Sequence, residues 1–295
     1  MTSPAGFRDN RAELVTVVAL GRIAPARILS ETLQPDRQGQ LRTLPSGGGI
    51  ALGLHAGDAV SRASARVADH AVPGVSAEAV GDHPAVPGDF HLLSCVGNDA
   101  YDEEGTWLGR VAGKRGGLAP GFWGPQLLGI EVDDDHGARL VPGRHLAVHA
   151  VGRGLEILDA PDVTLTNCSP WVLDQLPAWL EGHCLVLPVR CRVPAVFSGA
   201  GLGQDAWIGD VEVTNEEVLP ADLAFADLIA FDDLDGAHGR FCRSGWTTVG
   251  LVSHGPSGRP GHGVGITVLA SGPAGALRVE LDPGAGLGEA LRRLR

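Results

Sequence analysis

Short apolar runs recur along the chain, and clusters of Gly, Pro, Asp and Asn separate them. Over residues 145–151 the polarity of the side chains alternates, which is typical of a strand with one buried face. Runs of this length between turn residues predict strands rather than long helices. The predicted strands are residues 13–20, 49–54, 92–96, 145–151, 185–190, 228–231, 247–252 and 265–270.

Helical signals are few. Ser169 followed by Pro170 matches a helix N-cap and first helical residue, and Pro177 limits that helix to a short segment. A second short helix is expected within residues 287–295, where three arginines favour a helix C-terminus. The pattern predicts a mainly β protein with a few short helices. We place a boundary near residues 180–185, which gives two β subdomains, 1–182 and 183–295, each barrel- or sandwich-like.

Composition narrows the functional classes. The 295 residues are 44% hydrophobic, enough for a sizeable core, and the 43 glycines and 20 prolines suit short strands joined by tight turns. A net charge of −12 disfavours nucleic acid and anionic membranes as partners. The chain has neither an apolar run long enough to span a membrane nor a secretory signal pattern. Five dispersed cysteines without a CxxC pair indicate reduced thiols, so we expect a cytoplasmic protein.

Four residues are candidate ligands of a divalent metal. Asp69 and His70 are adjacent, so they enter one site only if a turn replaces a regular strand, and Pro73 with its following glycine favours such a turn. His254 and His262 lie beside glycines, which leave an imidazole uncovered. Together they would give a metal site with an open position. The alternatives are a hydrogen-bonded turn at residues 69–70, repeated at 82–83, and a solvated glycine-rich loop at 254–263.

Cys95 and Asn98 form a second candidate group. Residues 93–99 are expected to run from a strand end into a tight turn at Gly97, where backbone can approach a ligand. A thiol there suits a nucleophile or proton carrier, and the Asn98 amide suits a developing oxyanion. The alternative for Cys95 is simple packing, because free cysteines are often buried.

Lys114, Arg115 and Gly116 belong to a cationic glycine-rich segment that we expect to be a loop. Lys114 is the only lysine in the chain. No Ser or Thr follows it, so this is not a P-loop, but its charges and backbone amides suit a carboxylate or phosphate. The alternative is a charged hairpin turn. The glycines at 199–203 lack the dinucleotide-binding spacing, so no nucleotide cofactor is expected, although Asp205 and Asp210 beyond them suit a site lining. The acidic stretch at 232–238 lacks the spacing of a calcium-binding loop.

Several segments in order resemble the domain-of-unknown-function 4438 family. They are VTVVALGRIAPARI at 15–28, DHAVPGVS at 69–76, LSCVGNDA at 93–100, GKRGG at 113–117, and the stretches 152–162, 193–203 and 254–263. The resemblance implies a mostly β protein of two subdomains and brings no established activity. The family favours a histidine after the lysine of GKRGG. Here that position is Arg115, so a proton-transfer role is not carried over to it.

The leading hypothesis is an enzyme that acts on a small polar or anionic molecule by metal-assisted hydrolysis or elimination. Asp69, His70, His254 and His262 would hold an unidentified divalent metal, Lys114, Arg115 and Gly116 would bind the anionic group, and Cys95 and Asn98 would assist catalysis. The competing hypothesis is a non-catalytic protein that binds a small ligand or assembles with other copies. A homodimer is expected in either case, because association covers exposed strands.

Overall fold

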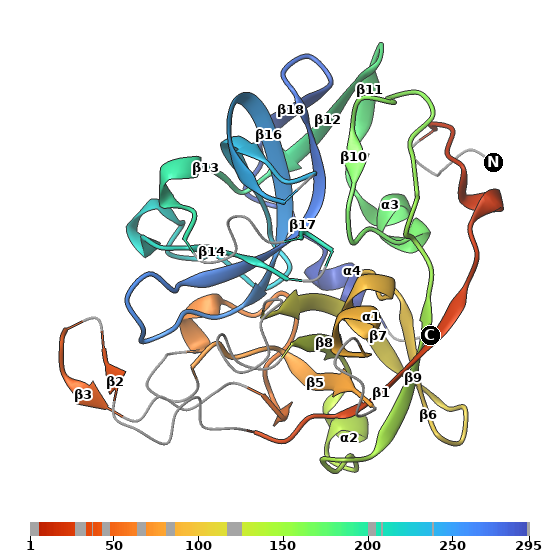
Figure 1. Ribbon diagram of the computed structural model, residues 1–295, viewed down its shortest axis with the longest axis vertical. Coiled ribbons are helices and arrows are strands. Elements are labelled where there is room, and N and C mark those ends of the chain that lie inside the picture. The colour runs from red at the N-terminus through yellow and green to blue at the C-terminus, as the bar shows by residue number, and fades with distance from the viewer. Residues whose placement is uncertain are drawn as a thin grey trace.

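The computed structural model describes residues 6–26, 34–36, 38–42, 48–63, 69–80, 86–116, 126–199, 205–207, 209–237 and 239–293. Strands dominate, which confirms the predicted mainly β fold with short helices (Figure 1). The strands are β1 (Val17–Ile23), β2 (Gln34–Pro35), β3 (Leu41–Arg42), β4 (Ile50–Ala51), β5 (Gly74–Ala79), β6 (Asp99–Asp102), β7 (Trp107–Arg115), β8 (Leu127–Glu131), β9 (His145–Ala150), β10 (Thr164–Leu165), β11 (Trp179–Glu181), β12 (Cys184–Val189), β13 (Cys191–Pro194), β14 (Val211–Val213), β15 (Leu228–Asp235), β16 (Phe241–His254), β17 (Val264–Pro273) and β18 (Leu277–Leu281). The helices are α1 (Val86–Leu93), α2 (Asp134–Gly137), α3 (Pro170–Gln175) and α4 (Gly288–Arg292), with single 3-10 turns at Arg11–Glu13, Val60–Arg62, Ala195–Phe197 and Glu216–Val218.

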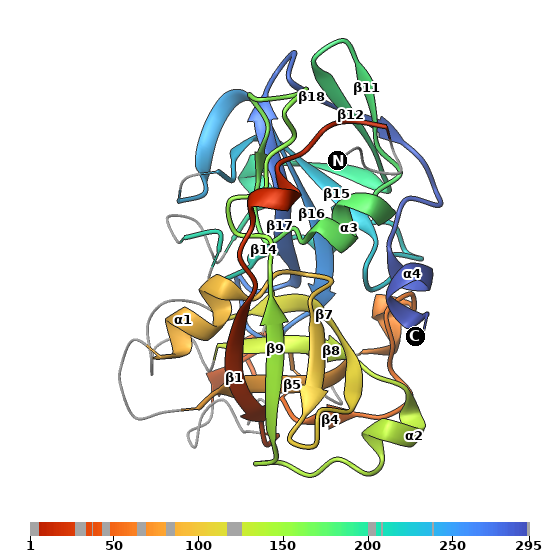
Figure 2. The same ribbon diagram turned by 90° about the vertical axis from the view of Figure 1, so that its right-hand side faces the viewer.

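Six strands close into an antiparallel barrel in the order β1-β9-β6-β7-β8-β5, and β4 extends it at β5. Closure comes from β1, which pairs with β9 along most of its length and with β5 at its end, where Gly21 faces Ala79. The barrel interior is packed with small and branched side chains, among them Ile23, Val111 and Val148. It therefore forms a core rather than a channel. Figure 2 shows β1 and β9 side by side in the barrel wall.

A second sheet, in the order β10-β17-β16-β15-β13 with β14 on β17, packs above the barrel in Figure 2. Both faces of β15 are buried. Leu228 and Ala230 belong to one hydrophobic cluster, and Ile229 and Phe231 belong to another. A strand covered on both faces needs an uninterrupted apolar run, as at residues 228–231. A three-stranded sheet, β11-β12-β18, completes this half of the molecule.

The barrel meets the second sheet where β7 crosses β16 and β17. Gly113 makes the close approach of these strands feasible, because a Cβ there would lie 2.4 Å from Cβ of Ser253. The Lys114 amide donates to Thr267 Oγ1 at 2.8 Å, and Ser253 Oγ donates to the Lys114 carbonyl at 3.2 Å. These bonds fix one end of β7 against the second sheet.

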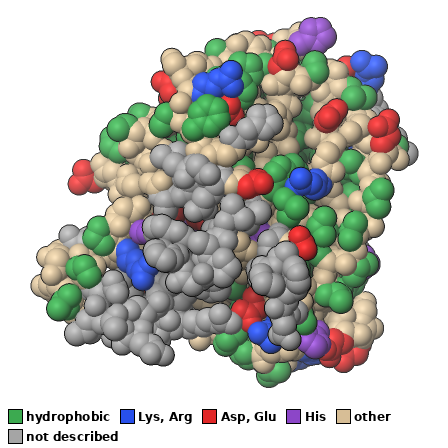
Figure 3. All heavy atoms as spheres, in the orientation of Figure 1, with side chains coloured by type: hydrophobic (Ala, Val, Ile, Leu, Met, Phe, Trp, Pro, Cys, Tyr) green, Lys and Arg blue, Asp and Glu red, His purple; other side chains and the backbone are tan. Residues whose placement is uncertain are grey.

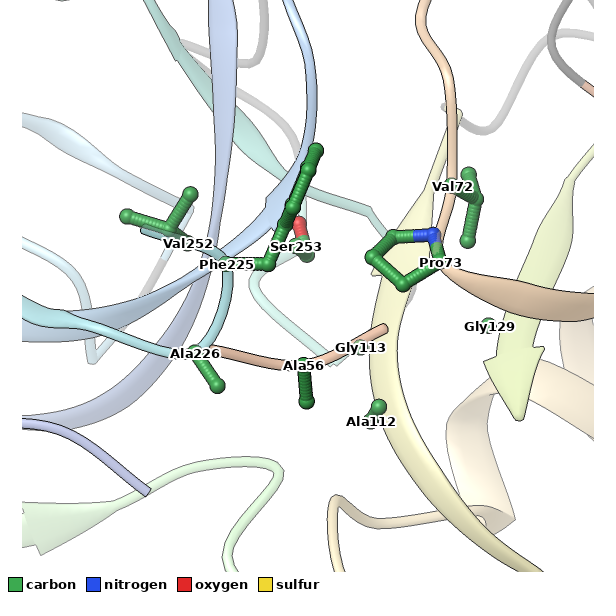
Figure 4. Close-up of a pocket in the computed structure, with 10 residues that line it drawn as sticks. All are labelled: Ala56, Val72, Pro73, Ala112, Gly113, Gly129, Phe225, Ala226, Val252 and Ser253. Carbon is green, nitrogen blue, oxygen red and sulfur yellow. The ribbon is translucent and has the colours of Figure 1, made fainter. Parts of the chain in front are cut away.

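A hollow of about 220 Å³, part of it open to solvent, lies at this junction. Figure 4 shows Phe225 and Val252 on one side and Val72 and Pro73 on the other. Small apolar side chains and glycines line most of it, and none of its ten lining residues is titratable. The hollow itself therefore offers no acid, base or metal ligand.

Several predicted elements are confirmed. Strands occur at β9, β12, β15, β16 and β17 as expected, and the predicted short helix is α3. Ser169 caps α3 by accepting a hydrogen bond from the Val172 amide, and Pro170 is its first residue. The expected C-terminal helix is α4. The predicted subdomain boundary between residues 182 and 183 falls in the turn between β11 and β12, and it stays a prediction.

Four expectations were wrong in detail. Residues 92–96 do not form a strand: α1 continues to Leu93, and only Val96 makes an isolated bridge, to Cys168. The strand expected at 13–20 is displaced to Val17–Ile23, and the one at 49–54 shrinks to Ile50–Ala51. Residues 113–115 are the end of β7 rather than a loop. β8 pairs with this segment, and the second sheet packs against it.

Charged side chains on the described part of the face in Figure 3 are scattered, and basic side chains lie singly among the other residues. Among the described helices, none is long and apolar enough to cross a membrane.

Candidate metal centre

Asp69 and His70 lie in the segment that leads into β5. His70 has a left-handed backbone, with φ of 54°, a region in which histidine is enriched among non-glycine residues. This conformation brings the two neighbouring side chains together, and Asp69 Oδ2 lies 2.7 Å from His70 Nδ1. Asp69 Oδ1 accepts hydrogen bonds from Ser257 Oγ at 2.8 Å and from the Gly258 amide at 2.7 Å. The carboxylate therefore fixes the His70 ring, whose Nε2 faces Glu212 Oε1 at 3.1 Å.

Strand register places His254 and Glu212 on either side of a glycine. His254 at the end of β16 pairs with Gly265 on β17, and Gly265 pairs on its other side with Glu212 on β14. A Cβ on Gly265 would lie 1.9 Å from His254 Nε2, so the imidazole covers this glycine. The ring thereby extends across β17, and its Nε2 comes within 3.9 Å of Glu212 Oε1.

His254 is held from both ring nitrogens. Its Nδ1 lies 2.8 Å from the Gly255 carbonyl, which can only accept, so Nδ1 carries the proton. Its Nε2 lies 2.7 Å from Asp210 Oδ2. Burial would lower the pKa of His254, but Asp210 and Glu212 outweigh burial and raise it. A positive ion, either a proton or a metal, is therefore favoured between Nε2 and these carboxylates.

His262 lies in the connection between β16 and β17, and its Nδ1 is 2.6 Å from Glu212 Oε2. Its side chain is 16% exposed, whereas those of His70, Glu212 and His254 are at most 8% exposed. The rings of His70 and His262 meet edge to face with centroids 5.8 Å apart. We call His70, Asp210, Glu212, His254 and His262 the histidine–carboxylate cluster. Its more accessible side is at His262.

The electrostatics favour a cation in the cluster. Burial would raise the pKa values of Asp69 and Glu212, but the neighbouring histidines hold both below their usual range. Arg115 is buried beside them, and burial lowers its pKa although Asp210, Asp69 and Glu212 oppose that effect. With neutral imidazoles, the three carboxylates outnumber the two guanidinium groups that act on them, those of Arg115 and Arg240, and an excess of negative charge remains. Buried charge of one sign must be compensated, here by protons or by a metal.

The donor atoms have the spacing of metal ligands. They form two sets, each with all its atoms within 4.8 Å of one another: His70, Glu212 and His262, and Asp210, Glu212 and His254. Two ligands about 2.1 Å from a tetrahedral ion would lie about 3.4 Å apart. Metal-binding histidines commonly donate their second N–H to a carboxylate or carbonyl, as His70 does to Asp69 and His254 to Gly255. The residues present therefore fit a divalent transition metal.

Cys95 and Asn98 lie apart from this cluster, next to the end of α1. Burial raises the pKa of Cys95 to about 11, which keeps the thiol protonated at neutral pH. The side chain of Asn98 forms hydrogen bonds with backbone groups. Its Oδ1 accepts from the Cys95 amide at 2.7 Å, and its Nδ2 donates to the Val151 carbonyl at 2.8 Å. These contacts describe a bracing role for Asn98.

Lys114 and Arg115 leave β7 in different surroundings. Lys114 Nζ donates to the carbonyls of His91 and Trp207, and burial lowers the pKa of this amine to about 7. Arg115 interacts with the carboxylates of the cluster, and the Gly116 amide donates to Asp210 Oδ1 at 2.8 Å. Of the predicted anion-binding segment, Arg115 and Gly116 thus border the cluster. Gly117, residues 82–83 and 200–204, and His238 lie outside the described residues.

The sequence interpretation missed Glu212, which is common to both donor sets, and treated Asp210 only as part of a loop lining. The available signal was their spacing. Residues two apart in an extended segment point to the same side, so Asp210 and Glu212 flanking Val211 suggest two carboxylates directed at one place. Asp69, assigned as a ligand from sequence, bonds to His70 on the side away from Glu212.

Comparison with known proteins gives a family without an assigned activity. Residues 33–174 match the N-terminal domain of unknown function DUF4438, and residues 176–291 match its C-terminal domain. The crystal structure of TM1086 superposes with a TM-score of 0.87 at 29% sequence identity, covering 97% of this chain and 99% of that chain. No curated protein matches the chain. The matches cover most of the sequence, and the chain belongs to the DUF4438 family.

Proposed function

We propose that this protein is a cytoplasmic metal-dependent enzyme that hydrolyses, or eliminates a group from, a small polar or anionic molecule. The observation that carries the proposal is the orientation of two histidines. His70 and His254 each have Nδ1 bonded to an acceptor, and each directs Nε2 toward a carboxylate, His70 toward Glu212 and His254 toward Asp210. This is how proteins prepare imidazoles to bind a metal.

The primary metal position is the set His70, Glu212 and His262. Three protein ligands leave a coordination position for water or substrate, which is typical of catalytic rather than structural zinc sites. His262 is the most exposed of the three, so the open position would lie on its side. A bound divalent ion would supply a Lewis acid and a water of lowered pKa.

Arg115 supports an anionic substrate. Its guanidinium interacts with Asp210 and Glu212 of the cluster and with Asp69 beside it. A metal in the site would satisfy these carboxylates, and Arg115 would then add positive charge for an incoming carboxylate or phosphate. Lys114 contributes less, because its ammonium group already donates to two carbonyls.

The first experiment is elemental analysis of protein purified without a histidine tag and without added metal. We expect divalent metal in the wild type and a loss of at least half of it in His70→Ala and in His262→Ala. His145→Ala is the matched control, because His145 also faces a carboxylate, Glu103, but on the barrel surface. A folded wild type that stays metal-free even after supplementation with Zn²⁺, Mn²⁺ and Co²⁺ would contradict the proposal.

The alternative is a non-catalytic assembly protein, and the outer face of β1 favours it. Val18 and Leu20 are 56% and 63% exposed on neighbouring outward positions of this strand. Exposed apolar side chains on a barrel wall suit the contact of two identical subunits. Under this alternative, Val18→Asp with Leu20→Asp would convert a homodimer to a monomer in light scattering, while metal content would not change.

A further inference from the structure

We infer that the histidine–carboxylate cluster holds two divalent ions bridged by the carboxylate of Glu212. This rests on the proposed function, because one ion occupies the set His70, Glu212 and His262. The second ion occupies the set Asp210, Glu212 and His254. The structure shows these as separate groups of three donors with one member in common.

The position of Glu212 carries the inference. Its Oε2 lies 2.6 Å from His262 Nδ1, while its Oε1 lies 3.1 Å from His70 Nε2 and 3.9 Å from His254 Nε2. Oε2 therefore faces His262, and Oε1 lies between His70 of the first set and His254 of the second set, so the carboxylate reaches donors of both sets. A carboxylate so placed offers one oxygen to each of two ions. In hydrolases with two metals the ions lie about 3.5–4 Å apart.

The second set has its own supporting contacts. The Gly255 carbonyl holds the proton on His254 Nδ1, and the Gly116 amide holds Asp210 Oδ1. These contacts leave His254 Nε2 and Asp210 Oδ2 facing each other at 2.7 Å. A set that only braced the strands would not need the side chain of position 265 removed to admit the imidazole. Hydrogen bonds to neighbouring groups therefore hold the side chains of His254 and Asp210 in place, as the bond to Asp69 holds that of His70.

Two ions also define the substrate class more closely. With the charges of Arg115 and Arg240, one divalent ion would slightly outweigh the carboxylates Asp69, Asp210 and Glu212, and two ions would leave a larger excess of positive charge. That excess attracts hydroxide and the oxygens of an anion. The residues of both sets would therefore suit a substrate with carboxylate or phosphoryl oxygens, for which two ions would supply Lewis acidity and a water of lowered pKa.

The test is a titration of metal-free full-length protein with Mn²⁺ alone, followed by elemental analysis after desalting and by electron paramagnetic resonance. We expect two equivalents and an exchange-coupled signal in the wild type. His254→Ala and Asp210→Asn should each retain one equivalent with an uncoupled signal, and Glu212→Gln should lose coupling. His145→Ala should match the wild type. Circular dichroism and thermal melting of each variant identify any loss of fold.

The outcomes separate the two proposals. One equivalent in the wild type, lost in His262→Ala but kept in His254→Ala and Asp210→Asn, overturns the second ion and leaves the proposed function standing. No bound ion under any condition overturns both. Two equivalents that persist in His254→Ala overturn the ligand assignment. If the alanine variant fails to fold, the isosteric Asp210→Asn decides.

Discussion

The left-handed backbone of His70 turns its side chain and that of Asp69 toward each other. Asp69 then contacts Nδ1 of the imidazole, and Glu212 lies at Nε2 on the opposite edge of the ring. In the proposed metal site, Asp69 would therefore position His70 rather than bind the ion itself. Its second oxygen is fixed by Ser257 and Gly258, which ties the His70 segment to the connection that carries His262. A carboxylate held in this way fixes both the tautomer and the orientation of the imidazole.

Asp69→Asn should weaken metal binding about 10- to 100-fold, because the neutral amide holds the His70 ring less firmly and makes it less basic. Affinity is measured by competition with a chelator of known strength. Asp133→Asn is the control. Asp133 also faces a histidine, His136, but it caps α2 away from the cluster. Equal affinities of Asp69→Asn and the wild type would show that Asp69 does not orient a ligand.

Some residues of the histidine–carboxylate cluster could be named from the sequence, and others could not. The sequence offered reason to consider the histidines at 254 and 262 together with the Asp69–His70 pair but could not show whether they meet, and in the structure both rings lie beside that of His70. Glu212 was not identified, since one carboxylate between two valines is ordinary in a strand. Only the pairing of β14 with β17 places it opposite Gly265 and near three imidazoles.

At the scale of elements, the cluster depends on a row across three strands, His254 on β16, Gly265 on β17 and Glu212 on β14. The glycine supplies the space in which the imidazole lies. Elements with strong local signals were predictable, such as α3 with its Ser169 cap. The segment at 92–96 was not, because a short apolar run fits a helix end as well as a strand.

Gly265→Ala should displace the His254 ring, since the new Cβ would lie 1.9 Å from Nε2. We expect loss of metal at this set and destabilisation by about 1–3 kcal/mol, the usual cost of overpacking. Metal analysis and chemical denaturation measure the two effects. Gly284→Ala is the control, because the nearest atom to its Cβ would be Asp282 Oδ1 at 3.5 Å, an ordinary contact. Unchanged metal content in Gly265→Ala would contradict this account of the row.

At the scale of the molecule, the barrel and the second sheet meet at β7, where Lys114 is buried. Its ammonium group joins the carbonyl of His91 in α1 to that of Trp207 beyond the barrel. Barrel closure through β1 was beyond sequence analysis. It depends on pairings of β1 with β5 and with β9, which are distant in the chain. Local patterns indicated the strands but not their partners.

Lys114 should make stability depend on pH between about 7 and 9. Its pKa is lowered to about 7 in the folded protein, whereas an unfolded lysine titrates near about 10.4. In this window the unfolded chain binds the extra proton, so the free energy of unfolding rises with pH, by at most about 1.4 kcal/mol per pH unit. Below pH 7 both states are protonated and the contribution is constant.

The measurement is the difference in unfolding free energy between the wild type and Lys114→Met across pH 6–9, in which other titrating groups largely cancel. Methionine removes the titration and keeps an apolar stem of similar length. The window ends at pH 9 because the raised pKa of Cys95 adds an opposite trend above it. A difference that stays constant with pH would contradict the lowered pKa of Lys114.

The two matched family segments divide the cluster unequally. Asp69 and His70 lie within residues 33–174, whereas Asp210, Glu212, His254 and His262 lie within 176–291. A fragment of residues 33–174 would carry His70 but lack β1, which closes the barrel, and a fragment of residues 176–291 would carry the other donors without His70. If metal chemistry is what selection preserves, the two segments can be inherited, duplicated or exchanged between genomes only as a unit.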